Sequence, residues 1–244
     1  MEKEVKGEYN MDFTLPVLIF CFFVFLFIVY ILSHDDYVFL RKNISMEQVF
    51  NLSFLTGFFA IFFSRLLYVL SNPSIDYLNP LVFFLFTYFP GLSLAGAILG
   101  SLVFMLISNK KIPKSRLFDF FSIAFLGSST LGFLIFKIIN LLSDKLKNYY
   151  EFVIPFIYFV FFVVFIKILF PMQRKGELKD GTLGYLALSS FSVVTFLTNL
   201  WSQKNRIFFI FGVEDIFLAI IFIFSMILLS KQEKLFQKFK VIKK

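Results

Sequence analysis

The chain has one cysteine and one histidine, and this scarcity excludes several kinds of site. Cys21 lies in an apolar run, so neither an internal disulfide nor a cysteine metal cluster can form. A thiol in such a run packs as a small apolar side chain. His34 lies beside Asp35 and Asp36 in an expected solvated loop, which excludes multi-histidine metal sites and disfavours a Ser-His-Asp triad. We therefore predict no metal site and no cofactor.

Charged residues are also scarce, at 16% of the 244 residues, while 59% are hydrophobic. A soluble domain has roughly 25% charged and 45–50% apolar residues. The chain thus has too little polar surface to face water all round, and we predict an all-α polytopic membrane protein. The net charge of +8 does not indicate nucleic acid, because no basic surface is interleaved with base-stacking aromatic residues.

Seven apolar runs predict about seven transmembrane helices, which form one membrane domain over residues 13–230. At about 1.5 Å per residue, such runs cross a hydrocarbon core of about 30 Å, although the third is short. Ser45 and Gln48 form a capping-box pattern before the second run. The runs are Phe13–Leu32, Val49–Leu70, Leu92–Ile107, Phe118–Leu142, Phe152–Phe170, Leu183–Trp201 and Ile207–Leu229.

Three further segments flank or interrupt this domain. Residues 1–12 are acidic and lack the basic start of a signal peptide, so we predict an external N-terminal segment before a retained first helix. Residues 72–91 contain Pro73, Pro80 and Pro90 and an apolar stretch too short to span, which predicts an external or interfacial segment. Residues 231–244 predict a basic cytoplasmic tail that binds anionic lipid headgroups.

The distribution of lysine and arginine predicts the orientation in the membrane. The connections on one side carry 15 of these residues and those on the other side carry 6. Because cytoplasmic loops are enriched in lysine and arginine, the N-terminus is predicted outside and the C-terminus in the cytoplasm.

A few charged residues fall inside the predicted spans. Arg65, Lys137, Glu214 and Asp215 come at a similar depth, toward the outer leaflet. Each buried charge costs at least about 2.5–3.5 kcal/mol in lipid, so we predict that the four pair around a polar cavity. The alternatives are a purely structural ion network and simple proximity to the headgroups. Lys167 lies near the inner end of its helix, where its side chain can reach the headgroups.

Two patches of small residues predict close approach of helices. Gly96 and Gly100 form a Gly-x-x-x-Gly step, and Ser93, Ala97 and Ser101 repeat the spacing. Small side chains allow close helix packing and also leave backbone amides or hydroxyls able to bind a ligand. Packing alone explains either patch, and both interpretations stay open. The second patch consists of Gly127, Ser128, Ser129, Thr130 and Gly132.

Several motifs follow one another in a recognisable order. Residues 63–70 read Phe-Ser-Arg-Leu-Leu-Tyr-Val-Leu, residues 79–81 read Asn-Pro-Leu, residues 90–97 read Pro-Gly-Leu-Ser-Leu-Ala-Gly-Ala, and a basic linker then leads to Asp119. In this order the chain resembles the bacterial phosphatidylglycerol–prolipoprotein diacylglyceryl transferases. Their corresponding motifs are Gly-Ala-Arg-Leu-Gly-Tyr-Val-Leu, Asn-Pro-Leu and Gly-Gly-Leu-Ser-Phe-His-Gly-Gly. The resemblance covers nearly the whole chain.

The resemblance implies a multi-pass protein of the bacterial inner membrane that binds phosphatidylglycerol and the signal peptide of a prolipoprotein. The implied reaction moves a diacylglyceryl group onto the lipobox cysteine. Arg65 and Tyr68 keep the residues that the family has at functional positions. The candidate lipid-binding residues are Arg65, Tyr68, Ser93, Gly96, Thr130, Lys137, Glu214 and Asp215.

The chain differs from the family at other polar positions. A threonine hydroxyl donates one hydrogen bond but carries no charge, whereas thiolate formation and departure of a phosphate both benefit from cations. Lys137, about two turns beyond Thr130, is a hypothetical replacement cation, and no catalytic residue is assigned. The changed positions are Ala95 for histidine, Thr130 and Thr195 for arginine, Phe133 for asparagine and Asn199 for glutamate.

Three functions are compatible with these observations. The first is a divergent diacylglyceryl transferase, and the second is a non-catalytic relative that binds phospholipid or prolipoprotein. The third, a transporter, is disfavoured because no matched pair of broken helices occurs in two halves of the chain. We favour loss of catalysis over activity because each replacement is uncharged.

Overall fold

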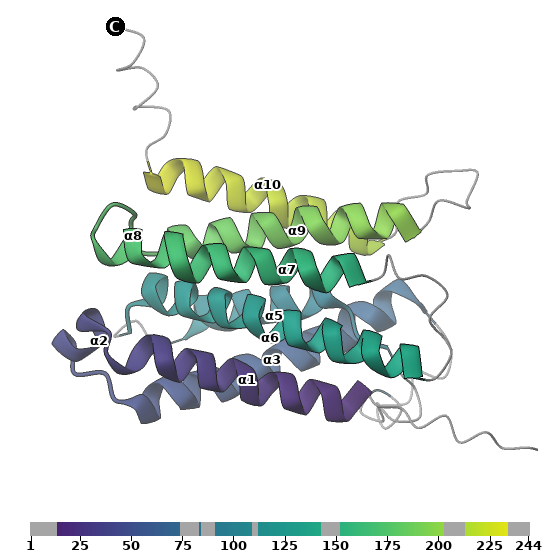
Figure 1. Cartoon of the computed structure of the whole chain (residues 1–244), viewed down its shortest axis with the longest axis horizontal. Helices are drawn as coiled ribbons and strands as arrows, with labels where there is room; N and C mark the ends of the chain where they lie inside the picture. The colour runs from purple at the N-terminus through teal and green to yellow at the C-terminus, as the bar shows by residue number, and fades with distance from the viewer. Residues whose placement is uncertain are drawn as a thin grey trace, which may run out of the picture.

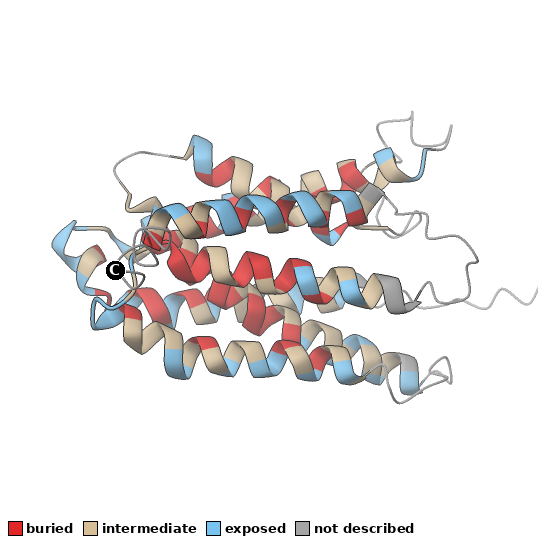
Figure 2. Ribbon diagram, turned by 90° about the horizontal axis from the view of Figure 1, so that it is seen from above, coloured by how far each residue is buried: buried red, intermediate tan, exposed pale blue. Residues whose placement is uncertain are grey.

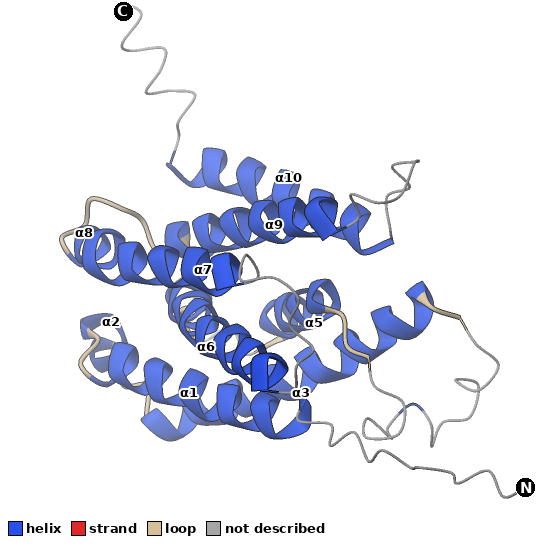
Figure 3. Ribbon diagram, turned by 45° about the vertical axis from the view of Figure 1, so that its right-hand side comes forward, coloured by secondary structure: helices blue, strands red, loops and turns tan. Residues whose placement is uncertain are grey.

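The computed structural model describes residues 14–73, 83, 91–108, 112–142, 152–202 and 213–233, and these ranges contain helices and no strand (Figures 1 and 3). The predicted all-α class is therefore confirmed. The elements are α1 (Thr14–His34), α2 (Tyr37–Arg41), α3 (Met46–Ser71), α5 (Leu94–Ile107), α6 (Lys114–Leu142), α7 (Val153–Val164), η3 (Phe165–Leu169), α8 (Phe170–Arg174), α9 (Thr182–Ser202) and α10 (Val213–Glu233).

Each predicted apolar run falls on a helix or, for the fifth run, on the consecutive elements α7, η3 and α8. The capping box is confirmed, since the Gln48 N–H donates to Ser45 Oγ and the Ser45 N–H donates to Gln48 Oε1, both at 3.3 Å. Of the predicted tail 231–244, the first three residues form the end of α10 and the remaining residues lie outside the described residues. The predicted segment 1–12, most of 72–91 and the first residues of the seventh run also lie outside them.

Four helices within the described ranges are long and apolar enough to cross a membrane: Leu15–His34, Met46–Ser71, Lys114–Ile139 and Val153–Arg174. Helix α5 is apolar but shorter. These lengths and compositions are compatible with a membrane protein. The predicted count of seven spanning helices and the orientation stay predictions.

Helix α6 lies at the centre of the bundle (Figure 1). It packs against α1, α7 and α9, while α3 packs on α5 and α10 packs on α9. Successive long helices run in opposite directions, so α2, α8 and the last residues of α10 gather at one end. We call this the α2 end, and we call the opposite end, where α3 finishes and α5 begins, the Arg65 end. The described parts of the connections predicted on the basic side of the membrane thus lie together at the α2 end.

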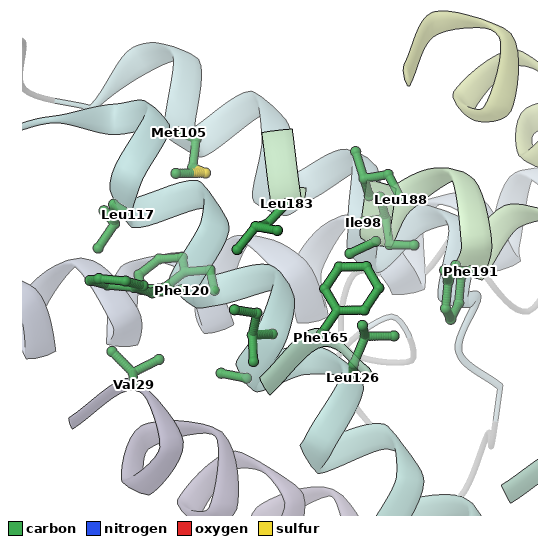
Figure 4. Close-up of a cluster of buried hydrophobic side chains, with 14 of the residues drawn as sticks. Val29, Ile98, Met105, Leu117, Phe120, Leu126, Phe165, Leu183, Leu188 and Phe191 are labelled. Atoms are coloured by element: carbon green, nitrogen blue, oxygen red, sulfur yellow. The ribbon is translucent and has the colours of Figure 1, made fainter. Parts of the chain in front are cut away.

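The core forms around α6 (Figure 4). Phe120, Ile123 and Ala124 of this helix have no exposed surface. Side chains from α1, α5, η3 and α9, among them Val29 and Leu183, converge on the same cluster. Because α6 is buried along one side for several turns, it positions the residues of every helix that packs on it.

The outward sides of the helices carry exposed residues (Figure 2), and many of these residues are large and apolar. Phe23 and Phe27 on α1 are 65% and 62% exposed, and Ile227 on α10 is 60% exposed. Large contiguous apolar surface is rare on proteins surrounded by water. The exposed side chains therefore fit a lipid environment better than an aqueous one.

The fifth predicted helix contains a π-helical turn at η3 before Pro171. Proline has no N–H and its ring meets the carbonyl four residues earlier, so a regular α-helix cannot continue through it. The helix adapts with a wider turn, in which the Phe170 N–H donates to the Phe165 carbonyl. Lys167 lies on this turn with its side chain exposed, as expected for a lysine that reaches the headgroups.

Candidate functional site

Arg65 on α3 is completely buried near the Arg65 end of the bundle. Its Nε donates to the Phe83 carbonyl at 3.1 Å and its Nη1 donates to the Gly91 carbonyl at 2.9 Å. Its guanidinium carbon lies 5.7 Å from the centre of the Tyr68 ring, within the range of a cation–π contact. The structure therefore places two sequence-predicted residues, Arg65 and Tyr68, together.

Gly91 allows this arrangement because its backbone adopts a φ of 146°, which residues with side chains rarely reach. A Cβ at this position would lie 2.1 Å from the Tyr68 ring. Only glycine lets the chain pass the ring closely enough for its carbonyl to reach Arg65.

Ser93 fixes the start of α5 against α3. Its hydroxyl accepts from the Gly96 N–H at 3.3 Å as the N-cap of α5. Its backbone N–H donates to the Ser64 carbonyl at 3.2 Å, and the Ser64 hydroxyl donates to the Ser93 carbonyl at 2.8 Å. Ser93 was predicted as a lipid-binding residue, and the contacts described give it a capping role that holds α5 in place.

The Gly-x-x-x-Gly step brings α5 directly onto the backbone of α3. A Cβ on Gly96 would lie 2.5 Å from the Phe63 carbonyl oxygen, and one on Gly100 would lie 2.4 Å from the Phe59 carbonyl oxygen. No side chain fits in these gaps. The packing interpretation of this patch is therefore confirmed.

The candidates on α6 are Thr130 and Lys137. Thr130 is buried, and its hydroxyl donates to the Leu126 carbonyl of the same helix at 2.8 Å. Lys137 is partly buried two turns further on. The small-residue patch around Thr130 also lies against neighbouring side chains, since a Cβ on Gly132 would be 2.6 Å from Cys21 Sγ.

The candidates on α10 lie beside α9. Asp215 is 2% exposed and accepts a hydrogen bond from Asn199 Nδ2 at 2.9 Å, and Glu214 is partly buried. One turn earlier on α9, the Thr195 hydroxyl lies 2.9 Å from the hydroxyl of the buried Tyr158. Two positions where the family has charged residues, 195 and 199, are thus hydrogen-bonded to neighbouring helices here.

The structure groups the candidates in three places. Arg65, Tyr68, Ser93 and Gly96 meet where α3 and α5 join, Thr130 and Lys137 follow α6, and Glu214 and Asp215 lie on α10. The connections 74–82, 84–90, 143–151 and 203–212 near these groups lie outside the described residues. A shared polar cavity of the charged candidates therefore stays a prediction.

A partly open cavity of about 280 Å³ lies between α1, α3, α5, α6 and α9. Its lining is apolar apart from a few hydroxyls and the thiol of Cys21. None of the predicted site residues lines it, but it reaches Ser64 and Leu92, which neighbour Arg65 and Gly91 in the chain. The small residues Gly57 and Ala60, one turn apart on α3, are the signal from which sequence reasoning could have found it.

A second buried arginine, Arg116, lies at the α2 end and was missed as a structural centre by the sequence reasoning. Its Nη2 and Nε donate to Asp36 Oδ2 at 2.8 and 3.1 Å, and its Nη1 donates to Asp180 Oδ1 at 3.1 Å. The side chains of Arg116 and Asp36 are 5% and 3% exposed. This ion pair joins α6 to the connections that precede α2 and α9.

Asp119 lies beside this pair and has no exposed surface. It accepts from the N–H groups of Gly181 at 2.6 Å and Gly184 at 2.8 Å, and also from Gln173 Nε2. A carboxylate at a helix N-terminus satisfies amides that lack helical partners and interacts favourably with the helix dipole. Asp119 thus fixes the beginning of α9.

Glu233 fixes the same point from α10. It is 8% exposed and accepts from the Lys179 N–H at 3.0 Å and from the Thr182 hydroxyl at 2.6 Å. Aspartate and glutamate at the α2 end therefore bind arginine and backbone amides. In the described ranges, no three histidine, cysteine, aspartate or glutamate side chains are grouped so as to hold a metal ion.

Comparisons of this chain with models of protein families, with curated proteins and with solved structures found no match. The resemblance to the diacylglyceryl transferases therefore depends on the motifs of the sequence alone. It stays a prediction at this point.

Proposed function

We propose that the protein binds a phospholipid within its helix bundle, with one acyl chain in the cavity and the headgroup toward Arg65. The observation that carries this proposal is the apolar cavity, which begins beside the segment that holds Arg65. We further propose seven spanning helices in a bacterial inner membrane, an outside N-terminus and phosphatidylglycerol as the lipid.

The size and length of the cavity support an acyl chain. Its volume of about 280 Å³ exceeds the roughly 150 Å³ of an apolar protein cavity that binds benzene. Its lining on α5 extends from Leu94 to Met105, which is about 16 Å along a helix. A space that is long and apolar fits a hydrocarbon chain better than a compact polar solute.

The hydroxyls in the cavity wall add little polarity. Besides Ser122, the wall has four hydroxyls, and those of Thr56, Ser64, Ser101 and Ser128 each donate to a backbone carbonyl, at 2.7 to 3.1 Å. Their hydrogen-bonding protons are therefore directed to the protein, and the wall offers few donors to an occupant. An apolar occupant would bury its surface against this wall and so stabilise the bundle.

Arg65 supports the position of the headgroup. It is one residue from Ser64 in the cavity wall, and an arginine binds a phosphate with charge-assisted hydrogen bonds. Arg65 and Tyr68 also keep the residues that the family has at functional positions. Both considerations favour an anionic phospholipid over an uncharged one.

The test is a binding titration of the delipidated protein in detergent with phosphatidylglycerol, read by native mass spectrometry. We expect saturable binding of one lipid, weaker binding of phosphatidylcholine and at least a tenfold loss of affinity in Arg65→Ala, since bonds to charged groups contribute about 1.5–3 kcal/mol. Arg174→Ala is the matched control, because Arg174 is exposed at the α2 end.

A second variant tests the role of the cavity without altering the segment around Arg65. Ala97 lines the cavity, so Ala97→Phe fills it without changing Arg65. Binding that survives in both Arg65→Ala and Ala97→Phe, or that never saturates in the parent protein, would contradict the proposal.

The second candidate function is transfer of the diacylglyceryl group to the lipobox cysteine of a bound prolipoprotein, which the motif around Arg65 and Tyr68 favours. We place non-catalytic binding first because Ala95 and Thr130 carry no charge where the family has histidine and arginine. The test is lipidation of a lipobox peptide, with a standard family member as positive control. A mass shift of the peptide would establish the transferase, and its absence beside a working control would leave binding alone.

A further inference from the structure

Phe118 lines the cavity toward the α2 end of the bundle. Among its lining residues, Phe118 lies nearest the start of α6 and Met105 lies nearest the end of α5. The polar side chains of Arg116 and Asp119 follow at this end, where they bind charged groups and backbone amides. Phe118 is thus the lining residue of α6 that lies nearest the α2 end.

The Phe118 ring packs directly against α9. A Cβ on Gly184 would lie 2.2 Å from two atoms of this ring, so the ring rests directly on the α9 backbone where that residue has no side chain. Tyr185, the next residue, has its ring centre 5.3 Å from that of Phe118. The ring cannot move toward α9 unless the helix itself moves.

The polar contacts at the α2 end hold α9 in that position. Asp119, adjacent to Phe118, binds the N–H groups of Gly181 and Gly184. Glu233 binds Thr182 and Lys179 in the same turn. Separating a buried carboxylate from its hydrogen-bond donors costs substantial free energy. The support behind Phe118 is therefore rigid compared with an apolar contact.

We propose that Phe118 is the end wall of the acyl-chain site and sets the length of hydrocarbon that the cavity accepts. This inference depends on the proposed phospholipid binding and specifies the acyl-chain length that the site prefers. A chain that enters from the Arg65 end extends along α5 until its terminal methyl meets the Phe118 ring. Longer chains have to leave their last carbons outside the cavity or bend.

The experiment measures affinity for phosphatidylglycerols with saturated chains from lauroyl to stearoyl, by competition in native mass spectrometry. Removing the ring in Phe118→Ala lets longer chains bury further methylenes, each of which raises affinity about fourfold. We expect the stearoyl-to-lauroyl affinity ratio to rise at least tenfold. Phe118→Leu, a milder change, should shift the ratio in the same direction by less, and Phe118→Trp should shift it toward shorter chains.

Phe23→Ala is the matched control, since Phe23 is 65% exposed on the outer face of α1 and does not line the cavity. Its ratio should equal that of the parent protein. Unchanged ratios in Phe118→Ala, Phe118→Leu and Phe118→Trp, with lipid still bound, would overturn the end-wall proposal and leave the proposed function intact. Absence of saturable binding in the parent protein would instead remove the proposed function.

Discussion

The two buried arginines lie at opposite ends of the bundle and differ in the partners that surround them. The hydrogen bonds described for Arg65 go to the carbonyls of Phe83 and Gly91, whereas Arg116 donates to the carboxylates of Asp36 and Asp180. The bonds described at the two ends thus differ in the charge of the acceptor, and a carboxylate forms the stronger, charge-assisted bond with a guanidinium. The comparison indicates that the α2 end is suited to holding the helices together, whereas binding of an anion at the Arg65 end is our proposal.

The largest effect on stability is expected at Arg116. Arg116→Met leaves Asp36, which is 3% exposed, without its charged partner and should lower the free energy of unfolding by about 3–5 kcal/mol. The measurement is chemical denaturation in detergent followed by circular dichroism. Asp36→Asn in the same chain should recover part of the loss, because the charge that lacks a partner is then removed. Equal stability of Arg116→Met and the parent protein would remove the contrast between the two ends.

A smaller loss is expected where α5 lies on α3. The Cβ introduced by Gly100→Ala would lie 2.4 Å from the Phe59 carbonyl oxygen, so the helices must separate. Overpacking of this kind costs about 1–3 kcal/mol, and it should also weaken phosphatidylglycerol binding by displacing the start of α5. The two readouts are denaturation and the lipid titration.

Substitution of Arg65 should reduce lipid affinity more than stability, whereas substitution of Arg116 should mainly reduce stability. Arg65→Gln keeps an amide that can donate to the Phe83 or Gly91 carbonyl, so we expect a smaller stability loss than in Arg116→Met. Phosphatidylglycerol affinity should nevertheless fall at least tenfold, because the positive charge is gone. The denaturation and binding measurements made on one preparation test this. A loss of stability as large as that of Arg116→Met, with lipid binding unchanged, would reverse the assignment of the two ends.

The smallest effect is expected for the exposed pair at the α2 end. His34 Nδ1 lies 2.8 Å from Asp35 Oδ1, but their side chains are 52% and 86% exposed. Asp35→Asn should change the free energy of unfolding by less than about 0.5 kcal/mol, since solvent screens exposed pairs. Comparing it with Arg116→Met shows how much of the stability at this end comes from burial. A loss approaching that of Arg116→Met would show that exposure does not distinguish the two pairs.

The helices were predictable from the sequence because apolar runs and caps are local signals. The Ser45 capping box and the Gly96 and Gly100 contact both follow from spacing within a few residues. The pair between Arg116 and Asp36 was not predictable, because it joins residues 80 positions apart whose charges look like ordinary loop charges. The cavity was not predictable for the same reason, because its wall combines side chains from five helices that are distant in the sequence.

The candidate site was predicted in part for the same reason. Arg65 and Tyr68 are three residues apart on one helix, so their proximity follows from the helical repeat. Ser93 and Thr130 were proposed as ligand-binding residues, but their hydroxyls are hydrogen-bonded to the backbone of their own helices. A hydroxyl in a sequence gives no indication of whether a carbonyl one turn away already uses it.

Cys21 gives the protein a native reporter of occupancy, because the sole thiol of the chain lies in the cavity wall. A small maleimide dye can react at no other side-chain sulfhydryl, so labelling needs no engineered background. A hydrocarbon lodged beside this sulfur would slow alkylation, and its extraction would restore the rate. The reaction kinetics of an unmodified sample would thus follow filling and emptying of the bundle in real time.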